Sequence, residues 1–165
     1  MTMASDEREL LRFSVPSEPG NERLALARVA EAVADSGLSD DQLNRLKTAV
    51  AEATMNAIEH GNHNRADVDV ELTVVDTGDG VAVSITDQGG ARAPAQDAPV
   101  ELPDLEMKLA GLQSPRGWGL FLIRNMVDAM DVTTEGDLHI VRLQMRTTYP
   151  PRPRDPEGGS RAEQV

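Results

Sequence analysis

The sequence predicts an α+β fold, a two-layer sandwich in which helices cover one face of a mixed, mostly antiparallel β-sheet. Three observations support this class. Apolar residues recur at steps of three and four along three segments, which is the period of a half-buried helix. Apolar and polar residues alternate along five shorter segments, four of which form two hairpins across short glycine-containing turns. The predicted order is strand, two helices, hairpin, long loop, helix, hairpin.

The N-terminal part predicts one strand and one helix after a flexible start over residues 1–9, which are polar and acidic. Residues 10–15 alternate and end at Pro16, which lacks the amide hydrogen that an interior strand needs, so they predict an edge strand. Apolar residues at helical spacing then predict a helix over 21–35, closed by Gly37.

A second, central helix is predicted to begin after Ser39, which can accept a hydrogen bond from the first free amides, with Asp40 and Asp41 favourable in the first turn. Its end is predicted near Gly61-Asn62 as a left-handed cap. Its buried face consists of Leu43, Leu46, Val50, Ala53 and Ala57.

The remaining elements are two hairpins and one helix. Residues 67–75 and 81–87 alternate on either side of a glycine-containing turn and predict the first hairpin. A helix is predicted over 117–130, and the last hairpin joins 131–134 to 138–147. These elements predict one globular domain over residues 10–147.

Two stretches lack a strong pattern. Residues 88–116 are rich in Gly, Ala and Pro, with one weak helical pattern at 102–112, and so long a loop in a compact domain is more often functional than idle. The proline- and glycine-rich residues 148–165 predict a disordered tail.

Composition excludes several classes of function. The chain has 165 residues, with 28 acidic against 16 basic side chains and a net charge of −12, which argues against direct binding to nucleic acid. It has no cysteine, which excludes disulfides and thiolate chemistry and suits a cytoplasmic location. The sequence predicts neither a signal peptide nor a membrane span.

The first candidate motif lies on the central helix. Glu52, Asn56 and His60 are four residues apart, so their side chains stack along one face. A carboxylate and a carboxamide in this arrangement can hold a hydrated Mg²⁺ and orient an attacking hydroxyl. The alternative is the ordinary solvated side of an amphipathic helix.

The second motif ends the first hairpin. Asp87, followed by Gln88-Gly89-Gly90, can accept a hydrogen bond from an exocyclic amine, and the glycines let a planar ring lie against the backbone. The alternative is a plain turn, because Asp and Gly are common in turns.

The third motif, Arg116-Gly117-Trp118-Gly119-Leu120, lies between the long loop and the last predicted helix, with its glycines opening that helix. Free amides at a helix start can bind a phosphate, and the arginine adds a fork of donors suited to phosphate oxygens. The alternative is a glycine-rich hinge.

Taken together and in this order, the three motifs resemble the GHKL (Bergerat) ATP-binding fold. The segment from Glu52 to Gly61 looks like that of the anti-sigma-factor serine/threonine kinases of bacterial partner-switching systems. The resemblance covers about residues 10–147. It implies ATP and Mg²⁺ as cofactors, with residues 88–116 as the lid over the nucleotide.

The resemblance also implies roles for single residues. Glu52 matches the catalytic general base, and Asn56 matches the Mg²⁺ ligand. Asp87 matches the residue that bonds the adenine amine, with Gly89 beside the base. The segment that grips the phosphates matches Arg116, Gly117, Trp118, Gly119 and Leu120.

Two positions depart from the family pattern. Ala91 stands where the first glycine motif has its last glycine. The family often has Gly-Thr before its last strand, with the threonine reaching the adenine-binding aspartate, but this chain has Gly136-Asp137-Leu138-His139. The expectation is weaker adenine binding, or a water in place of the hydroxyl.

The resemblance implies a cytoplasmic protein, commonly a homodimer, that sequesters a sigma factor and phosphorylates a serine of an anti-sigma-factor antagonist. One alternative is a non-catalytic switch module with vestigial nucleotide binding. Another is a switch kinase that acts on a scaffold protein and controls a phosphatase. Intact Glu52 and Asn56 favour an enzyme, whereas the missing threonine favours the module.

Overall fold

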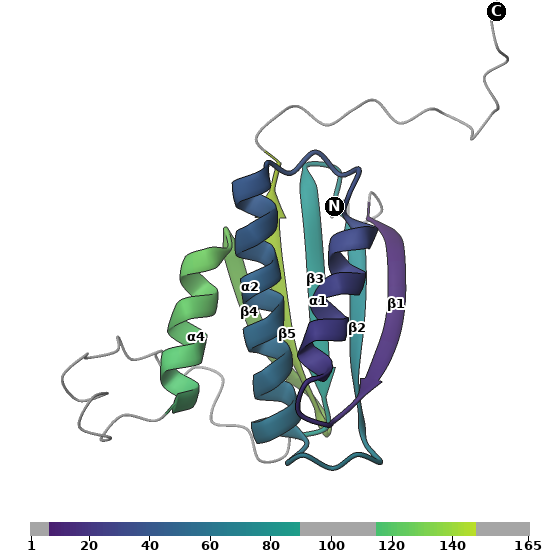
Figure 1. The fold of residues 1–165 in the computed structure, drawn as a ribbon, viewed down its shortest axis with the longest axis vertical. Coiled ribbons are helices and arrows are strands. Elements are labelled where there is room, and N and C mark those ends of the chain that lie inside the picture. The colour runs from purple at the N-terminus through teal and green to yellow at the C-terminus, as the bar shows by residue number, and fades with distance from the viewer. Residues whose placement is uncertain (1–6, 90–114, 148–165) are drawn as a thin grey trace, which may run out of the picture.

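The computed structural model describes residues 7–89 and 115–147 (Figure 1). Its elements are β1 (Arg8–Pro16), α1 (Asn21–Ala32), α2 (Asp40–Asn56), a π-helical turn (Ala57–Gly61), β2 (Asp69–Asp76), β3 (Gly80–Asp87), α4 (Pro115–Met126), β4 (Ala129–Glu135) and β5 (Leu138–Arg146). The predicted weak helix at 102–112, most of the predicted lid, and the predicted tail at 148–165 lie outside the described residues.

The five strands form one sheet in the order β1-β2-β3-β5-β4. The α+β class is confirmed, and β1 is an edge strand as Pro16 predicted. All four described pairings are antiparallel, so the expectation of a mixed sheet was wrong. The reason is the last hairpin: it inserts β5 beside β3 in the opposite direction and leaves β4 at the other edge.

The three helices lie on the same face of the sheet, with α2 between α1 and α4 (Figure 1). The predicted buried face of α2 is correct: Leu46, Val50, Ala53 and Ala57 are at most 3% exposed, and Leu43 is partly buried. In the described part of the chain, no helix is long and apolar enough to cross a membrane.

The predicted start of α2 is also correct. The Ser39 hydroxyl accepts a hydrogen bond from the Gln42 amide at 3.1 Å, and the Gln42 side chain accepts one from the Ser39 amide at 3.0 Å. This reciprocal capping box satisfies two amides that the helix itself leaves free. Gln42 also donates to the Arg146 carbonyl at 2.5 Å, which fixes the start of α2 to the end of β5.

The end of α2 differs from the predicted left-handed cap at Gly61-Asn62. The helix widens into the π-helical turn, in which the Asn62 amide donates to the Ala57 carbonyl at 2.8 Å. The left-handed residues are His63 (φ 52°) and Asn64 (φ 57°). Single π-turns in α-helices are frequent at functional sites, and this one shifts the last turn of the helix toward the end of β3.

Asn62, which follows that turn, joins three strands. Its side chain is 3% exposed and donates to the Ser17 hydroxyl at 2.9 Å and to the Asp69 carbonyl at 3.3 Å. Its amide oxygen accepts from the Gln88 amide at 2.9 Å. Asn62 therefore links the ends of β1 and β3 and the start of β2 beneath the end of α2.

We expect Asn62→Ala to lower the free energy of unfolding by about 2–3 kcal/mol, because it leaves buried polar groups without partners. Urea denaturation would measure the change. Asn125→Ala is the matched control, since the exposed Asn125 amide bonds only the Phe121 carbonyl of its own helix. Equal stability of the two variants would contradict a structural role for Asn62.

The ends of two further predicted helices were wrong. The helix expected over 117–130 ends at Met126, and Ala129 already belongs to β4. The reason is tertiary: the Asp128 amide donates to the Gln144 carbonyl at 3.0 Å, and the Asp128 carboxylate accepts from the Arg146 amide at 2.7 Å. Pairing with β5 therefore begins at Asp128, where the apolar pattern alone would continue the helix. The helix expected over 21–35 ends at Ala32.

Candidate functional site

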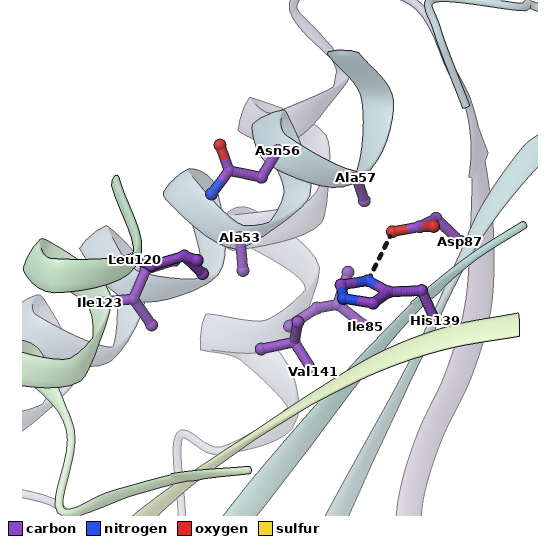
Figure 2. Close-up of a pocket in the computed structure, with 9 residues that line it drawn as sticks. All are labelled: Ala53, Asn56, Ala57, Ile85, Asp87, Leu120, Ile123, His139 and Val141. Carbon is purple, nitrogen blue, oxygen red and sulfur yellow. Dashed lines mark hydrogen bonds and ion pairs between the residues drawn. The ribbon is translucent and has the colours of Figure 1, made fainter. Parts of the chain in front are cut away.

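A small pocket lies between α2, α4 and the ends of β3 and β5 (Figure 2). The residues that line it are Ala53, Asn56, Ala57, Ile85, Asp87, Leu120, Ile123, His139 and Val141. One residue from each of the three sequence motifs reaches it, namely Asn56, Asp87 and Leu120. Most of the lining is apolar with a few convergent polar groups, which is the usual character of a small-molecule site.

Asp87 is the buried acid of this pocket. It continues the alternation of Val81, Val83 and Ile85, so its side chain faces the helices, and it is 3% exposed. One carboxylate oxygen accepts from the Gly89 amide at 2.8 Å, and the other lies 3.2 Å from Nδ1 of His139 (Figure 2). These contacts compensate the burial of the carboxylate.

Two glycines allow the backbone to approach Asp87. A Cβ at Gly61 would lie 2.5 Å from each carboxylate oxygen of Asp87. A Cβ at Gly89 would lie 2.7 Å from the Gly61 carbonyl oxygen. Both positions need glycine for space, and neither has a positive φ. Gly61 therefore has a packing role in place of the capping role that its sequence context predicted.

We expect Gly61→Ala to lower the free energy of unfolding by about 1–3 kcal/mol, because its methyl group overlaps the Asp87 carboxylate. Urea denaturation in a double-mutant cycle with Asp87→Ala would test this cause. The loss in free energy of unfolding caused by Gly61→Ala should be smaller in the Asp87→Ala variant, which already lacks the carboxylate. If Gly61→Ala lowers the free energy of unfolding equally with and without the Asp87 carboxylate, the proposed overlap between the methyl group and that carboxylate is contradicted.

Glu52 and Asn56 meet α4 at a buried glycine. A Cβ at Gly119 would lie 3.2 Å from Nδ2 of Asn56 and 3.4 Å from a carboxylate oxygen of Glu52. The four-residue spacing that stacks the two side chains on α2 thus directs both at the same turn of α4. The structure brings Glu52, Asn56 and Gly119 together at one point.

The residues at this point fit a magnesium nucleotide. Nδ2 of Asn56 is buried and makes no hydrogen bond to any described residue. The amide beside a carboxylate supplies the oxygen ligands that Mg²⁺ prefers. No group of three or more His, Cys, Asp or Glu residues gathers for a metal within 7–89 and 115–147, and Mg²⁺ typically uses one or two protein ligands together with phosphates.

The pocket is nearly closed in this structure. Its cavity volume is about 10 Å³, which is room for about one water. Leu120 and Ile123 of α4 form its wall opposite the sheet (Figure 2). A planar base does not fit this cavity as it stands.

The other predicted site residues lie within α4. That helix begins at Pro115, two residues before the predicted start at 117, so Gly117 and Gly119 lie inside its first turns. Arg116 and Trp118 belong to the same turns, but their side chains lie outside the described part of the structure. Gly90 and Ala91, and the predicted lid between 90 and 114, are likewise outside it.

His139 was not among the predicted site residues. His139 is 6% exposed and is the direct cross-strand partner of Asp87 in the β3–β5 ladder. The imidazole of His139 therefore contacts Asp87, whereas we had expected weaker adenine binding or a water in place of the absent threonine hydroxyl. The available signal was the alternation of His139 with Val141, Leu143 and Met145 on one face of the last strand, which places His139 toward the helices.

Comparisons with known proteins agree with this architecture. The sequence profile of the histidine kinase-like ATPase domain matches residues 15–145. The anti-sigma F factor of Clostridium beijerinckii is 33% identical over 135 residues, which cover 79% of this chain and 87% of that protein. The anti-sigma F factor of Geobacillus stearothermophilus is 32% identical over 131 residues, 76% of this chain and 82% of that protein.

Two solved structures share the fold. A structure of the RsbU and RsbW domains of a Mycobacterium tuberculosis protein superposes with a TM-score of 0.58 at 18% identity, covering 86% of this chain and 33% of that chain. The SiaB–SiaC complex of Pseudomonas aeruginosa superposes with a TM-score of 0.57 at 16% identity, covering 84% of this chain and 90% of that chain.

Proposed function

Because the chain belongs to the histidine kinase-like ATPase family and is a relative of the anti-sigma F factors, we propose that it is an ATP-dependent serine/threonine protein kinase that also restrains a sigma factor. The observation that carries this proposal is that Asn56 and Asp87 line one pocket between α2, α4 and the sheet, with Glu52 beside Asn56 at Gly119. A pure binding module would not need Glu52 or Asn56.

The buried end of the site recognises the base. Asp87 offers acceptor lone pairs to an exocyclic amine, which is the group that adenine carries. Gly61 and Gly89 let the backbone pack closely around the Asp87 carboxylate, which holds this acceptor in place. The apolar side chains of Ile85, Leu120 and Val141 provide the flat contacts of a purine site.

Phosphate transfer takes place at the outer end of the site. The hydroxyl oxygen of the acceptor serine forms a bond to the γ-phosphorus of ATP, the bond from that phosphorus to the bridging oxygen breaks, and ADP leaves. Glu52 takes the hydroxyl proton as general base. Asn56 would hold Mg²⁺ through its amide oxygen, and the bound ion would neutralise charge on the phosphates. The phosphates are bound by the start of α4, which carries Arg116, Gly117, Trp118, Gly119 and Leu120.

The closed pocket implies that nucleotide binding displaces α4. Gly119 packs directly on Glu52 and Asn56, so the same movement that admits the base also uncovers the catalytic carboxylate and the metal ligand. Nucleotide entry and completion of the catalytic site are therefore one conformational step.

The relationship to the anti-sigma F factors supports the partners that we propose. The chain holds a sigma factor in one state and phosphorylates an anti-sigma-factor antagonist in the other, acting as a homodimer in the cytoplasm. Its net charge of −12 favours partners with a basic surface.

One observation favours a second candidate, a switch module without catalysis. The cavity of about 10 Å³ does not accommodate a nucleotide as it stands. In that function α4 stays closed on α2, and the chain works by protein contacts alone.

The test is phosphate transfer from γ-labelled ATP to the antagonist proteins encoded by the same genome. We expect Mg²⁺-dependent label on a serine or threonine of one antagonist, located by mass spectrometry. Binding of the antagonist without any transfer of label would support the module and overturn the kinase.

A further inference from the structure

His139 is placed to act on Asp87 and not only to fill the core. Nδ1 of His139 lies 3.2 Å from one Asp87 carboxylate oxygen, and the two residues are paired in register across β3 and β5. The imidazole also lines the pocket, where Asp87 is the only other ionisable lining residue described (Figure 2). The next residues on the same face of β5 are Val141, Leu143 and Met145, all apolar and buried.

The hydrogen bond constrains the proton of the imidazole. An ionised carboxylate only accepts, so Nδ1 of His139 must carry the hydrogen. In the neutral ring, Nε2 is then an acceptor, and it points away from Asp87 (Figure 2). The other Asp87 oxygen accepts from the Gly89 amide at 2.8 Å. Both carboxylate oxygens are thus held by donors from the protein, which fixes the plane of the carboxylate.

We propose that His139 is a positioning residue for base recognition, which orients Asp87 through an Nδ1–H donor and so selects a base with an exocyclic amine over one with a carbonyl at that position. The proposal rests on the proposed nucleotide site and deepens it. With Nδ1 committed to Asp87, the polar atoms that Asp87 and His139 still offer to a base are acceptors. An amine donates to them, whereas the 6-oxo group of guanine meets them as a second acceptor.

Three substitutions separate this role from core filling. His139→Asn keeps a donor at the place of Nδ1 and can still hold Asp87. His139→Leu fills similar space without any donor. His63→Asn is the control, because His63 does not line the pocket and Asn tolerates its left-handed conformation (φ 52°).

The experiment is calorimetric titration of each full-length protein with ATP and with GTP. We expect the wild type to bind ATP more tightly than GTP. In His139→Leu, the affinity for ATP and the ratio of the ATP affinity to the GTP affinity should each fall at least tenfold. His139→Asn should stay within about threefold of the wild type in both quantities, because a charge-assisted hydrogen bond is kept. A purely structural role would lower both affinities equally and leave the ratio unchanged.

A nucleotide-free measurement is the ¹⁵N spectrum of histidine-labelled protein, with His139→Asn to assign the signal. The proposal predicts hydrogen on Nδ1 of His139 and none on Nε2, and the opposite tautomer would overturn it even if His139→Leu does not fold. Wild-type ATP binding with an unchanged ATP-to-GTP ratio in His139→Leu would overturn the role of His139 alone. A wild type that binds neither ATP nor GTP would overturn both the role of His139 and the proposed function.

Discussion

Glu52→Gln should lower phosphate transfer to the antagonist by about 10²- to 10⁴-fold, which is the usual contribution of a general base. Glutamine keeps the shape of the side chain but cannot take the hydroxyl proton. The affinity for ATP should stay the same, because the base acts in the transition state and contributes little to ground-state binding. Single-turnover transfer from γ-labelled ATP, together with calorimetric titration, would measure both quantities.

Glu59→Gln is the matched control for this substitution. Glu59 is an exposed glutamate in the π-helical turn that continues α2, and it does not line the pocket. Transfer by Glu59→Gln should equal that of the wild type. Equal transfer by Glu52→Gln and Glu59→Gln would remove Glu52 from the mechanism.

Asn56→Ala should abolish the gain in ATP affinity that Mg²⁺ provides, a loss of about 10- to 100-fold at saturating metal. The amide of Asn56 lies beside Glu52 and Gly119, and its nitrogen has no described hydrogen-bond partner, so the side chain is available to a ligand. Without Mg²⁺, the variant and the wild type should bind ATP alike. Titration with ATP at several magnesium concentrations would measure the effect.

Asn44→Ala provides the control, because Asn44 is exposed on the same helix and distant from the pocket lining. The affinity of Asn44→Ala for ATP should increase with Mg²⁺ as that of the wild type does. A wild type that binds ATP equally with and without Mg²⁺ would contradict the assignment of Asn56 as a metal ligand.

Features set by neighbouring residues along the chain could be predicted from the sequence. The helical face through Leu46 and Val50 follows from local periodicity, and the cap at Ser39 follows from residue type and position. The stacking of Glu52 over Asn56 is likewise a matter of four-residue spacing. These features need no knowledge of what packs against them.

Features set by tertiary contact could not be predicted in the same way. Asp87 and His139 are 52 residues apart, and only the register of β3 against β5 makes them partners. The end of α4 at Met126 depends on pairing of Asp128 with β5. Gly61 looked like a cap because helices commonly end at glycine, but its role depends on the position of Asp87 in space.

The most direct test of the central claim is calorimetric titration of the purified protein with ATP, with and without Mg²⁺, while the fluorescence of Trp118 is followed. Trp118 is the only tryptophan and belongs to α4, the helix that forms one wall of the pocket. Our account predicts magnesium-dependent binding with a change in Trp118 emission. No binding at millimolar ATP would contradict it and would leave a fold that is kept for protein contacts alone.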